Sequence, residues 1–172
     1  VPEAVLQAEQ GAVADLGLHT PVFGKKCGFD RKTLELIPCI YGDPDQVRAV
    51  VWGDSHAGSI AGAVQQVIGA KAGLAVYTHQ CATIFDTELK SKGEGNHCKI
   101  FNDKVFAQIK EMPRDVVIIV LNRYSANIHG PNESTRTNFG ILYPEGATQD
   151  SYAQYRERLS ASLCMIAEAR PV

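Results

Sequence analysis

Short apolar runs alternate with amphipathic segments through the middle of this chain, and this alternation restricts the fold more than any other feature. The runs cover residues 47–52, 74–78 and 116–121, lengths that suit buried strands. Segments with helical spacing of apolar residues follow them, at 56–69, around 101–109 and from 151 onward. Parallel strands need such crossovers, so the order predicts an α/β fold, a three-layer αβα sandwich.

The first 46 residues differ from the rest in having little periodicity. Residues 2–16 are predicted to form a short helix, and residues 17–46 an ordered extension that carries two cysteines. We therefore expect an N-terminal extension over residues 1–46 and one α/β domain over residues 47–172. A chain of 172 residues is long enough for one such core.

The composition excludes several classes of function. Formal net charge is -2, from 17 basic and 19 acidic side chains, without a basic stripe that would bind nucleic acid. No apolar run approaches the ~20 residues that span a bilayer. The sequence opens at Val1 in a helical pattern rather than in a signal peptide, so we expect it to be a piece of a longer chain.

Five cysteines occur, none of them in a Cys-x-x-Cys pair, which argues against a zinc ribbon. Cys27 and Cys39 flank a polar segment, as do Cys81 and Cys98, and a disulfide across each would restrict the unfolded chain. We predict these two disulfides, with Cys164 free on the apolar face of a helix. The alternative is five reduced thiols. Disulfides would place the domain in an oxidising compartment such as the periplasm.

Residues 50–57, with the sequence VVWGDSHA, carry the clearest chemical signal. A buried strand ends there, Gly53 permits a tight turn, and a helix begins at Ser55. The backbone N–H at a helix start has no partner within the helix, so that of Ser55 can stabilise an oxyanion beside its own Oγ, worth roughly 3 kcal/mol. Ala57 excludes the G-x-S-x-G nucleophile elbow. The alternative is that Ser55 only caps the helix.

The pentapeptide from Gly53 to Ala57, GDSHA, resembles the first sequence block of the SGNH hydrolase superfamily. It is similar above all to the SGNH domains fused to the C-terminus of acyltransferase-3 membrane proteins. Further similar features follow in the same order: CIYGD at 39–43, Cys81 after the second strand, CKIFN at 98–102 and NRYS at 122–125. The resemblance covers residues 27–170. It implies the SGNH hydrolase fold, with a flavodoxin-like parallel sheet.

Enzymes of this kind move an acyl group, usually acetyl, onto or off a carbohydrate hydroxyl. The resemblance implies that Ser55 forms an acyl-enzyme and that a sugar hydroxyl of a cell-surface polysaccharide or lipopolysaccharide then attacks it. It implies an acyl donor delivered by a fused acyltransferase-3 membrane domain. The domain would lie in the periplasm, as part of a bacterial inner-membrane protein. No cofactor, metal or nucleic-acid partner is expected.

The catalytic Asp and His of this family lie in an Asp-x-x-His block near the C-terminus. That block does not occur in the 172 residues. We therefore expect the C-terminal end of the domain to be missing from this sequence, together with the general base for Ser55.

The other expected oxyanion donors are irregular. The family places a glycine N–H after the second strand, where this chain has no glycine, so a backbone N–H near Cys81 is the candidate. Asn122 is the candidate side-chain donor after the third strand. Arg123, beside it, is expected to face the oxyanion or to contact the substrate.

Three further residues are expected near the site. Asp54 would orient the turn by accepting backbone hydrogen bonds, and His56 should point away from Ser55 Oγ. His129 lies in the long polar segment 125–149, where it would line the substrate cleft. Of the remaining histidines, His79 follows the second strand and could face the site.

Two other functions fit the same residues. Water could replace the sugar as acceptor, which would make the domain a carbohydrate acetyl esterase. Alternatively, the absent base and the absent second-block glycine fit a non-catalytic domain that binds glycans.

Overall fold

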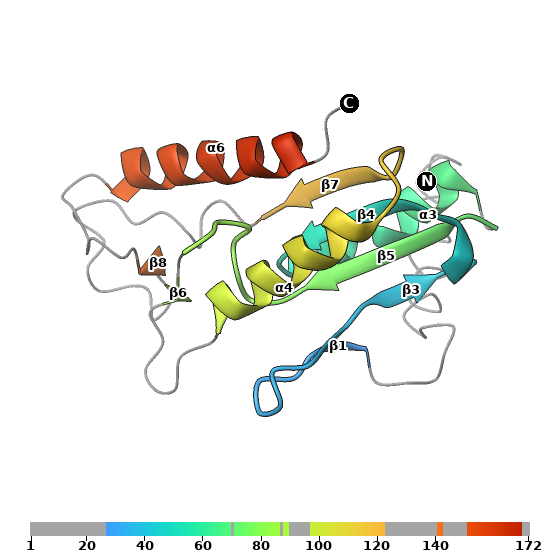
Figure 1. The fold of residues 1–172 in the computed structure, drawn as a ribbon, viewed down its shortest axis with the longest axis horizontal. Helices are drawn as coiled ribbons and strands as arrows, with labels where there is room; N and C mark the ends of the chain where they lie inside the picture. Colours follow the sequence, from blue (N-terminus) through green and yellow to red (C-terminus); the bar gives the residue numbers. More distant parts are fainter. Residues whose placement is uncertain are drawn as a thin grey trace, which may run out of the picture.

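The computed structural model of the protein describes residues 27–69, 71–86, 88–89, 97–122, 141–142 and 151–169 (Figure 1). The helix predicted over residues 2–16 lies outside these residues. Among the described helices, none combines the length and the apolar character needed to cross a membrane.

A four-stranded sheet forms the centre of the fold, in the order β3-β5-β4-β7 (Figure 1). Its strands are β3 (Cys39–Tyr41), β4 (Val47–Gly53), β5 (Gly73–Thr78) and β7 (Val117–Leu121). The three predicted strands, β4, β5 and β7, are parallel, and the first of them lies between the other two. This order confirms the α/β class. Because β3 is antiparallel to β5, the sheet is mixed, and the extension before residue 47 supplies one of its strands.

The central strand β4 is buried on both faces. Val50, Val51 and Trp52 are each 0% exposed, although their side chains alternate between the two sides of the sheet. Burial on both faces requires apolar side chains at successive positions, which explains the unbroken apolar run over residues 49–52, whereas Arg48 near the start of the strand is exposed.

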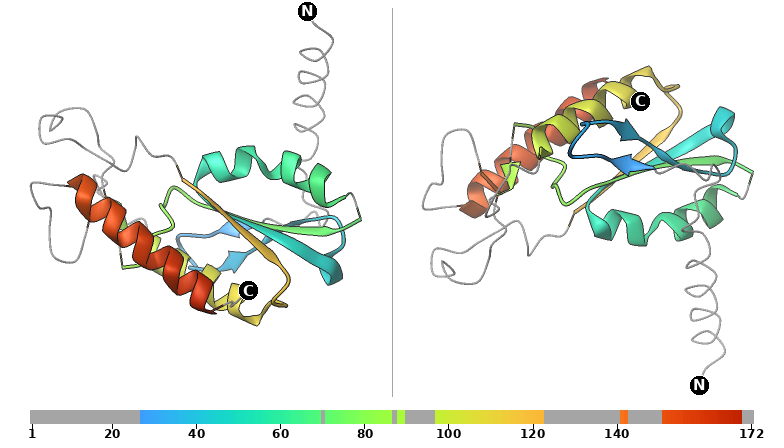
Figure 2. Two further views of the ribbon diagram at one scale, coloured as in Figure 1. Left: turned by 90° about the horizontal axis from the view of Figure 1, so that it is seen from above. Right: turned by 90° about the horizontal axis from the view of Figure 1, so that it is seen from below.

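Helices cover both faces of the sheet (Figure 2). Two short helices, α2 (Ser55–Ser59) and α3 (Ala61–Ile68), pack on one face, where Ala57 and Ala61 join the core around Val51. The longer helices α4 (Cys98–Glu111) and α6 (Ser151–Ala169) lie on the other face, around Trp52. The predicted three-layer sandwich is thereby confirmed.

The helix predicted over residues 56–69 is divided at Ile60, which ends α2 and precedes α3. The new start changes which side chains face inward. The helical spacing over residues 56–69 predicts Val67 on the apolar face and Gln65 off it. In the structure Val67 is 86% exposed, whereas Gln65 is only 7% exposed. The Gln65 amide is held inside because its Nε2 donates to the carbonyls of Gly69 and Ala72, at 3.0 and 2.8 Å.

The inward face of α6 also differs from the one that the spacing of apolar residues predicts, which consists of Tyr152, Tyr155, Leu159 and Leu163. Tyr155, Ser162 and Ile166 are buried, whereas Leu163 is 41% exposed. The prediction that Cys164 lies on the buried face is wrong, since this free cysteine is exposed. Buried positions spaced at 155, 162 and 166 follow the helical repeat, and residue 164 falls on the opposite side.

Smaller elements flank this core. A hairpin of β1 (Gly28–Phe29) and β2 (Leu36–Ile37) and the 3-10 helix η1 (Pro44–Gln46) lie before β4. Strand β6 (Glu88–Leu89) pairs with β8 (Ile141–Leu142), which lies in the segment predicted to be a long loop. The two predicted disulfides, Cys27–Cys39 and Cys81–Cys98, are both formed.

Candidate active site

The carboxyl ends of three parallel strands meet at one edge of the sheet. Gly53, the last residue of β4, is in register with Thr78 of β5 on one side and with Leu121 of β7 on the other. The residues that follow each strand therefore emerge side by side. This is the edge at which parallel α/β sheets place their ligands.

Gly53 makes the turn from β4 to α2 possible. Its φ is +156°, and a β-carbon at this position would overlap the carbonyl oxygen of Leu121 and lie 3.0 Å from the Ala57 β-carbon. Only glycine lets the chain pass so close to β7. The glycine thus fixes where α2 begins, and with it the position of Ser55.

Asp54 caps α2. Its Oδ1 accepts a hydrogen bond from the backbone N–H of His56 at 2.8 Å, and the same oxygen lies 3.4 Å from His56 Nδ1. The Asp54 side chain is 12% exposed and that of His56 48%. The carboxylate therefore orients the turn, and the His56 imidazole lies next to it at the surface.

Ser55 is exposed at the first position of α2. The carbonyl of Asp54 accepts from the N–H groups of Ala57 and Gly58, which leaves Ser55 N–H ahead of the helical bonding pattern. Within the described part of the chain, no imidazole or carboxylate is hydrogen-bonded to Ser55 Oγ. The Ser55 side chain is accessible from solvent.

The segment 81–85, which follows β5, is tied to α4. Cys81 forms its disulfide with Cys98, the first residue of that helix. One turn further on, Asn102 Nδ2 donates to the carbonyls of Ala82 and Ile84, at 2.8 and 3.1 Å. The sequence predicts a role in the site for a backbone N–H near Cys81. The Cys81 side chain itself is 0% exposed, so it serves to anchor the segment through its disulfide.

The same segment reaches the end of β7. Thr83 N–H donates to Oδ1 of Asn122 at 3.1 Å, and the Thr83 hydroxyl lies 3.4 Å from the same oxygen. Because β4 lies between β5 and β7, this contact joins the segments that follow the two neighbours of β4, which itself ends at Gly53, two residues before Ser55. Asn122, the candidate oxyanion donor, therefore uses its oxygen toward Thr83 and keeps its Nδ2 amino group as the donor.

The sequence assigns no role to Thr83, and it marks Asn102 only as the last residue of the CKIFN feature at 98–102. A signal for Asn102 was available, because it lies among Phe101, Val105 and Ile109 on the buried face of α4. A polar residue at such a position is buried only when it finds partners. No comparable signal marks Thr83, whose backbone makes the main contact.

Of the remaining candidate residues, the structure describes His79 but not Arg123 or His129. The ring of His79 packs against Phe29 and Phe101, with centroids 5.2 and 5.3 Å away. The backbone N–H of His79 donates to the carbonyl of Gly53 at 3.0 Å. His79 thus contacts both the last residue of β4 and helix α4, so it packs on the α4 side of the sheet.

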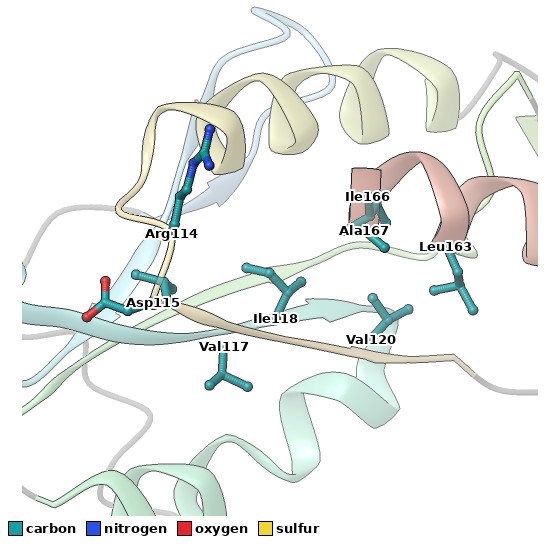
Figure 3. Close-up of a pocket in the computed structure, with 9 residues that line it drawn as sticks. Arg114, Asp115, Val117, Ile118, Val120, Leu163, Ile166 and Ala167 are labelled. Atoms are coloured by element: carbon teal, nitrogen blue, oxygen red, sulfur yellow. The ribbon is translucent and has the colours of Figure 1, made fainter. Parts of the chain in front are cut away.

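An apolar groove runs beside β7 (Figure 3). It has a volume of about 580 Å³ and is lined by Arg114, Asp115, Val116, Val117, Ile118, Val120, Leu163, Ile166 and Ala167. Val117 is 58% exposed, and within the described residues β7 pairs with β4 alone. The sheet therefore ends at β7 in an apolar edge that is open to a further strand.

The comparison with protein families agrees with this geometry. Residues 26–172 match the model of the SGNH domain that is fused to AT3, or acyltransferase-3, domains. Neither the curated proteins nor the solved structures gave a match. With an exposed serine after a buried strand, and most of its length matched by one family, the chain belongs to the SGNH domains of the kind fused to acyltransferase-3 domains.

Proposed function

We propose that this domain is an extracytoplasmic O-acyltransferase in which Ser55 passes an acyl group, acetyl in the simplest case, to a hydroxyl of a cell-surface carbohydrate. Membership in the family places the chain among acyl-transfer and esterase-type domains. The observation that carries the proposal is the exposed Ser55 at the Gly53 turn, beside Asn122 at the same sheet edge.

The reaction would proceed in two steps. Ser55 Oγ attacks the acyl carbonyl carbon, loses its proton to a base, and the donor's leaving group departs with a proton. A sugar hydroxyl then attacks the acyl-serine, gives its proton to the base, and releases Ser55 Oγ, which takes a proton back. In both steps the carbonyl oxygen becomes an oxyanion, and the proposed donors to it are Ser55 N–H and Asn122 Nδ2.

The base would come from a segment that pairs with the free edge of β7. Helix α6 runs back along β7, with Leu163 near Val120 and Ile166 near Ile118 (Figure 3). A strand that follows such a helix would pair parallel to β7, because the helix returns the chain to the edge of the sheet at which the parallel strands begin. Its carboxyl end would lie beside Asn122, so a His and an Asp placed there would reach Ser55.

Two further observations support the proposed location and partner. The disulfides Cys27–Cys39 and Cys81–Cys98 are bonds that persist in oxidising compartments. The family description names fusion to AT3 domains, which would deliver the acyl donor to Ser55.

The test uses the complete encoded protein and its Ser55→Ala variant. A fluorophosphonate probe should label Ser55, and hydrolysis of p-nitrophenyl acetate should fall on the order of 1,000-fold in the variant, because the nucleophile is lost. Added oligosaccharide should divert the acetyl group from water to the sugar. Mass spectrometry would identify both the labelled serine and the acetylated sugar.

Ser59→Ala provides the matched control. Ser59 is an exposed serine on the same short helix, and its hydroxyl donates to the carbonyl of His56 at 2.7 Å. This variant should keep both labelling and hydrolysis. Full acyl transfer by Ser55→Ala would contradict the proposal, and hydrolysis without any transfer would make the domain an esterase.

A further inference from the structure

Asn102 is a polar residue on the buried, mainly apolar face of helix α4. It is 0% exposed on the face of α4 that packs with Phe101, Val105 and Ile109. Burying an amide is unfavourable unless hydrogen bonds replace those with water. Asn102 Nδ2 makes two, to the carbonyls of Ala82 and Ile84, which lie on either side of Thr83.

The bond to Ala82 sets the direction of the Thr83 N–H. The Ala82 carbonyl and the Thr83 N–H belong to one trans peptide and point in opposite directions, so a carbonyl held on Asn102 turns this N–H away from Asn102. The N–H donates to Asn122 at 3.1 Å. A backbone N–H can only donate, so the Asn122 atom that it meets must be the oxygen. The orientation of the Asn122 amide is thereby fixed, with Nδ2 turned away from Thr83.

The segment that carries Thr83 is held at both ends as well. Cys81 is bonded to Cys98 before it, and the N–H of Phe85 donates to the Ser162 hydroxyl at 3.1 Å after it. Asn102 holds the middle. The segment that contacts Asn122 is therefore held at three places, two of them by residues of α4 and one by a residue of α6.

We propose that Asn102 is a positioning residue for acyl transfer. Its clamp on Ala82 and Ile84 holds Thr83 N–H against Asn122 Oδ1, and this leaves Asn122 Nδ2 to donate to the oxyanion that forms next to Ser55. The inference rests on the proposed function, because it assigns Asn102 to the same site. Asn102 does not touch the reacting atoms, so its effect must pass through Asn122.

A double-mutant cycle in the complete encoded protein tests this dependence, with p-nitrophenyl acetate as the probe. Asn122→Ala should lower kcat about 100-fold with little change in KM, the effect of losing one oxyanion donor. Asn102→Leu should lower kcat at least 10-fold in the wild-type background and less than 3-fold in the Asn122→Ala background. Equal losses in the two backgrounds would overturn the proposal.

Gln108→Leu is the control for damage to α4 in general. Gln108 lies on the same helix and is half-buried, and its amide contacts Tyr77 and Leu36. It should lower stability without changing kcat. Asn102→Ala replaces Asn102→Leu if the leucine variant does not fold.

Hydrogen exchange at the Thr83 amide tests the clamp without any activity. Exchange should be faster in both Asn122→Ala and Asn102→Leu than in wild type, because each removes a restraint on this N–H. Unchanged exchange in Asn102→Leu would overturn the clamp even in an active enzyme. If activity proves independent of Ser55, the proposed function fails, while faster exchange would still establish the clamp.

Discussion

The α-carbon of Gly53 faces the carbonyl oxygen of Leu121 so closely that no side chain fits between them. Gly53→Ala should therefore lower the free energy of unfolding by on the order of 3 kcal/mol, because β7 must move away and the positive φ becomes strained. Urea unfolding measures the stability, and fluorophosphonate labelling of Ser55 should fall with it.

Gly58→Ala is the matched control for Gly53→Ala. A β-carbon at Gly58 would lie 3.5 Å from Thr78 Cγ2, an ordinary contact, and Gly58 lies within α2. Alanine in a helix is more favourable than glycine by about 1 kcal/mol, so this variant should be as stable as wild type or more so. An equal loss in both variants would contradict the proposed close contact.

Gln65→Glu should destabilise the protein in a way that depends on pH. A carboxylate cannot donate to the carbonyls of Gly69 and Ala72, and burial would raise its pKa above the ordinary ~4.3. Stability is then retained below pH ~4.3 and lost as the pH rises, by roughly 3 kcal/mol at pH 7. Urea unfolding at pH 4 and pH 7 gives the difference.

The neighbouring Gln66 is the control, because it is exposed. Gln66→Glu should stay within about 0.5 kcal/mol of wild type at both pH values. If the two variants behave alike, Gln65 is not held inside in solution.

The two disulfides should differ in their effect on catalysis. Each closes a short loop, with separations of 12 and 17 residues, so replacing either pair by alanines should cost about 3 kcal/mol of stability. Only the pair Cys81–Cys98 holds the segment that contacts Asn122, so only its removal should lower kcat for p-nitrophenyl acetate. A comparable fall in kcat without Cys27–Cys39 would contradict this distinction.

Tyr77 should make stability depend on pH in the alkaline range. Burial raises the pKa of Tyr77 above its ordinary 10.0, and its hydroxyl donates to Gln108 Oε1 at 2.8 Å. The contribution of Tyr77 to the free energy of unfolding is fully present below pH 10, because the tyrosine is protonated in both states there. Above pH 10 the unfolded chain releases the proton first, so the free energy of unfolding decreases by at most about 1.4 kcal/mol per pH unit.

Tyr77→Phe removes that titration. At pH 8 the variant should be about 1 kcal/mol less stable than wild type, since it lacks the hydrogen bond. The difference should shrink as the pH is raised from 10 to 11. Parallel pH profiles for the two proteins, measured by urea unfolding, would show that Tyr77 is not the group responsible.

Features that depend on burial of a whole element could be predicted from the sequence. The run at residues 49–52 has no polar interruption because this part of β4 lies inside the sheet, and Gly53 marks the turn between that strand and α2. The disulfides followed from short spacings along the chain. In each case neighbouring residues determine the outcome.

Features that depend on contacts between distant residues could not be predicted. Gln65 is buried because two carbonyls beyond the end of α3 need a donor, and that arrangement follows the break at Ile60. The contact of Thr83 with Asn122 joins residues 39 positions apart through a backbone N–H, which has no signature in the sequence.

The two edge strands of the sheet, β3 and β7, differ in how readily they can pair with a strand of another molecule. Strand β3 is short, follows Pro38 and is bonded through Cys39 to Cys27, features that discourage further pairing. Strand β7 carries the apolar edge. A molecule with one sheet edge open to pairing forms closed dimers, whereas a molecule with two such edges can form fibres. We therefore expect the described sheet to self-associate only as dimers, which should disappear once the β7 edge is occupied.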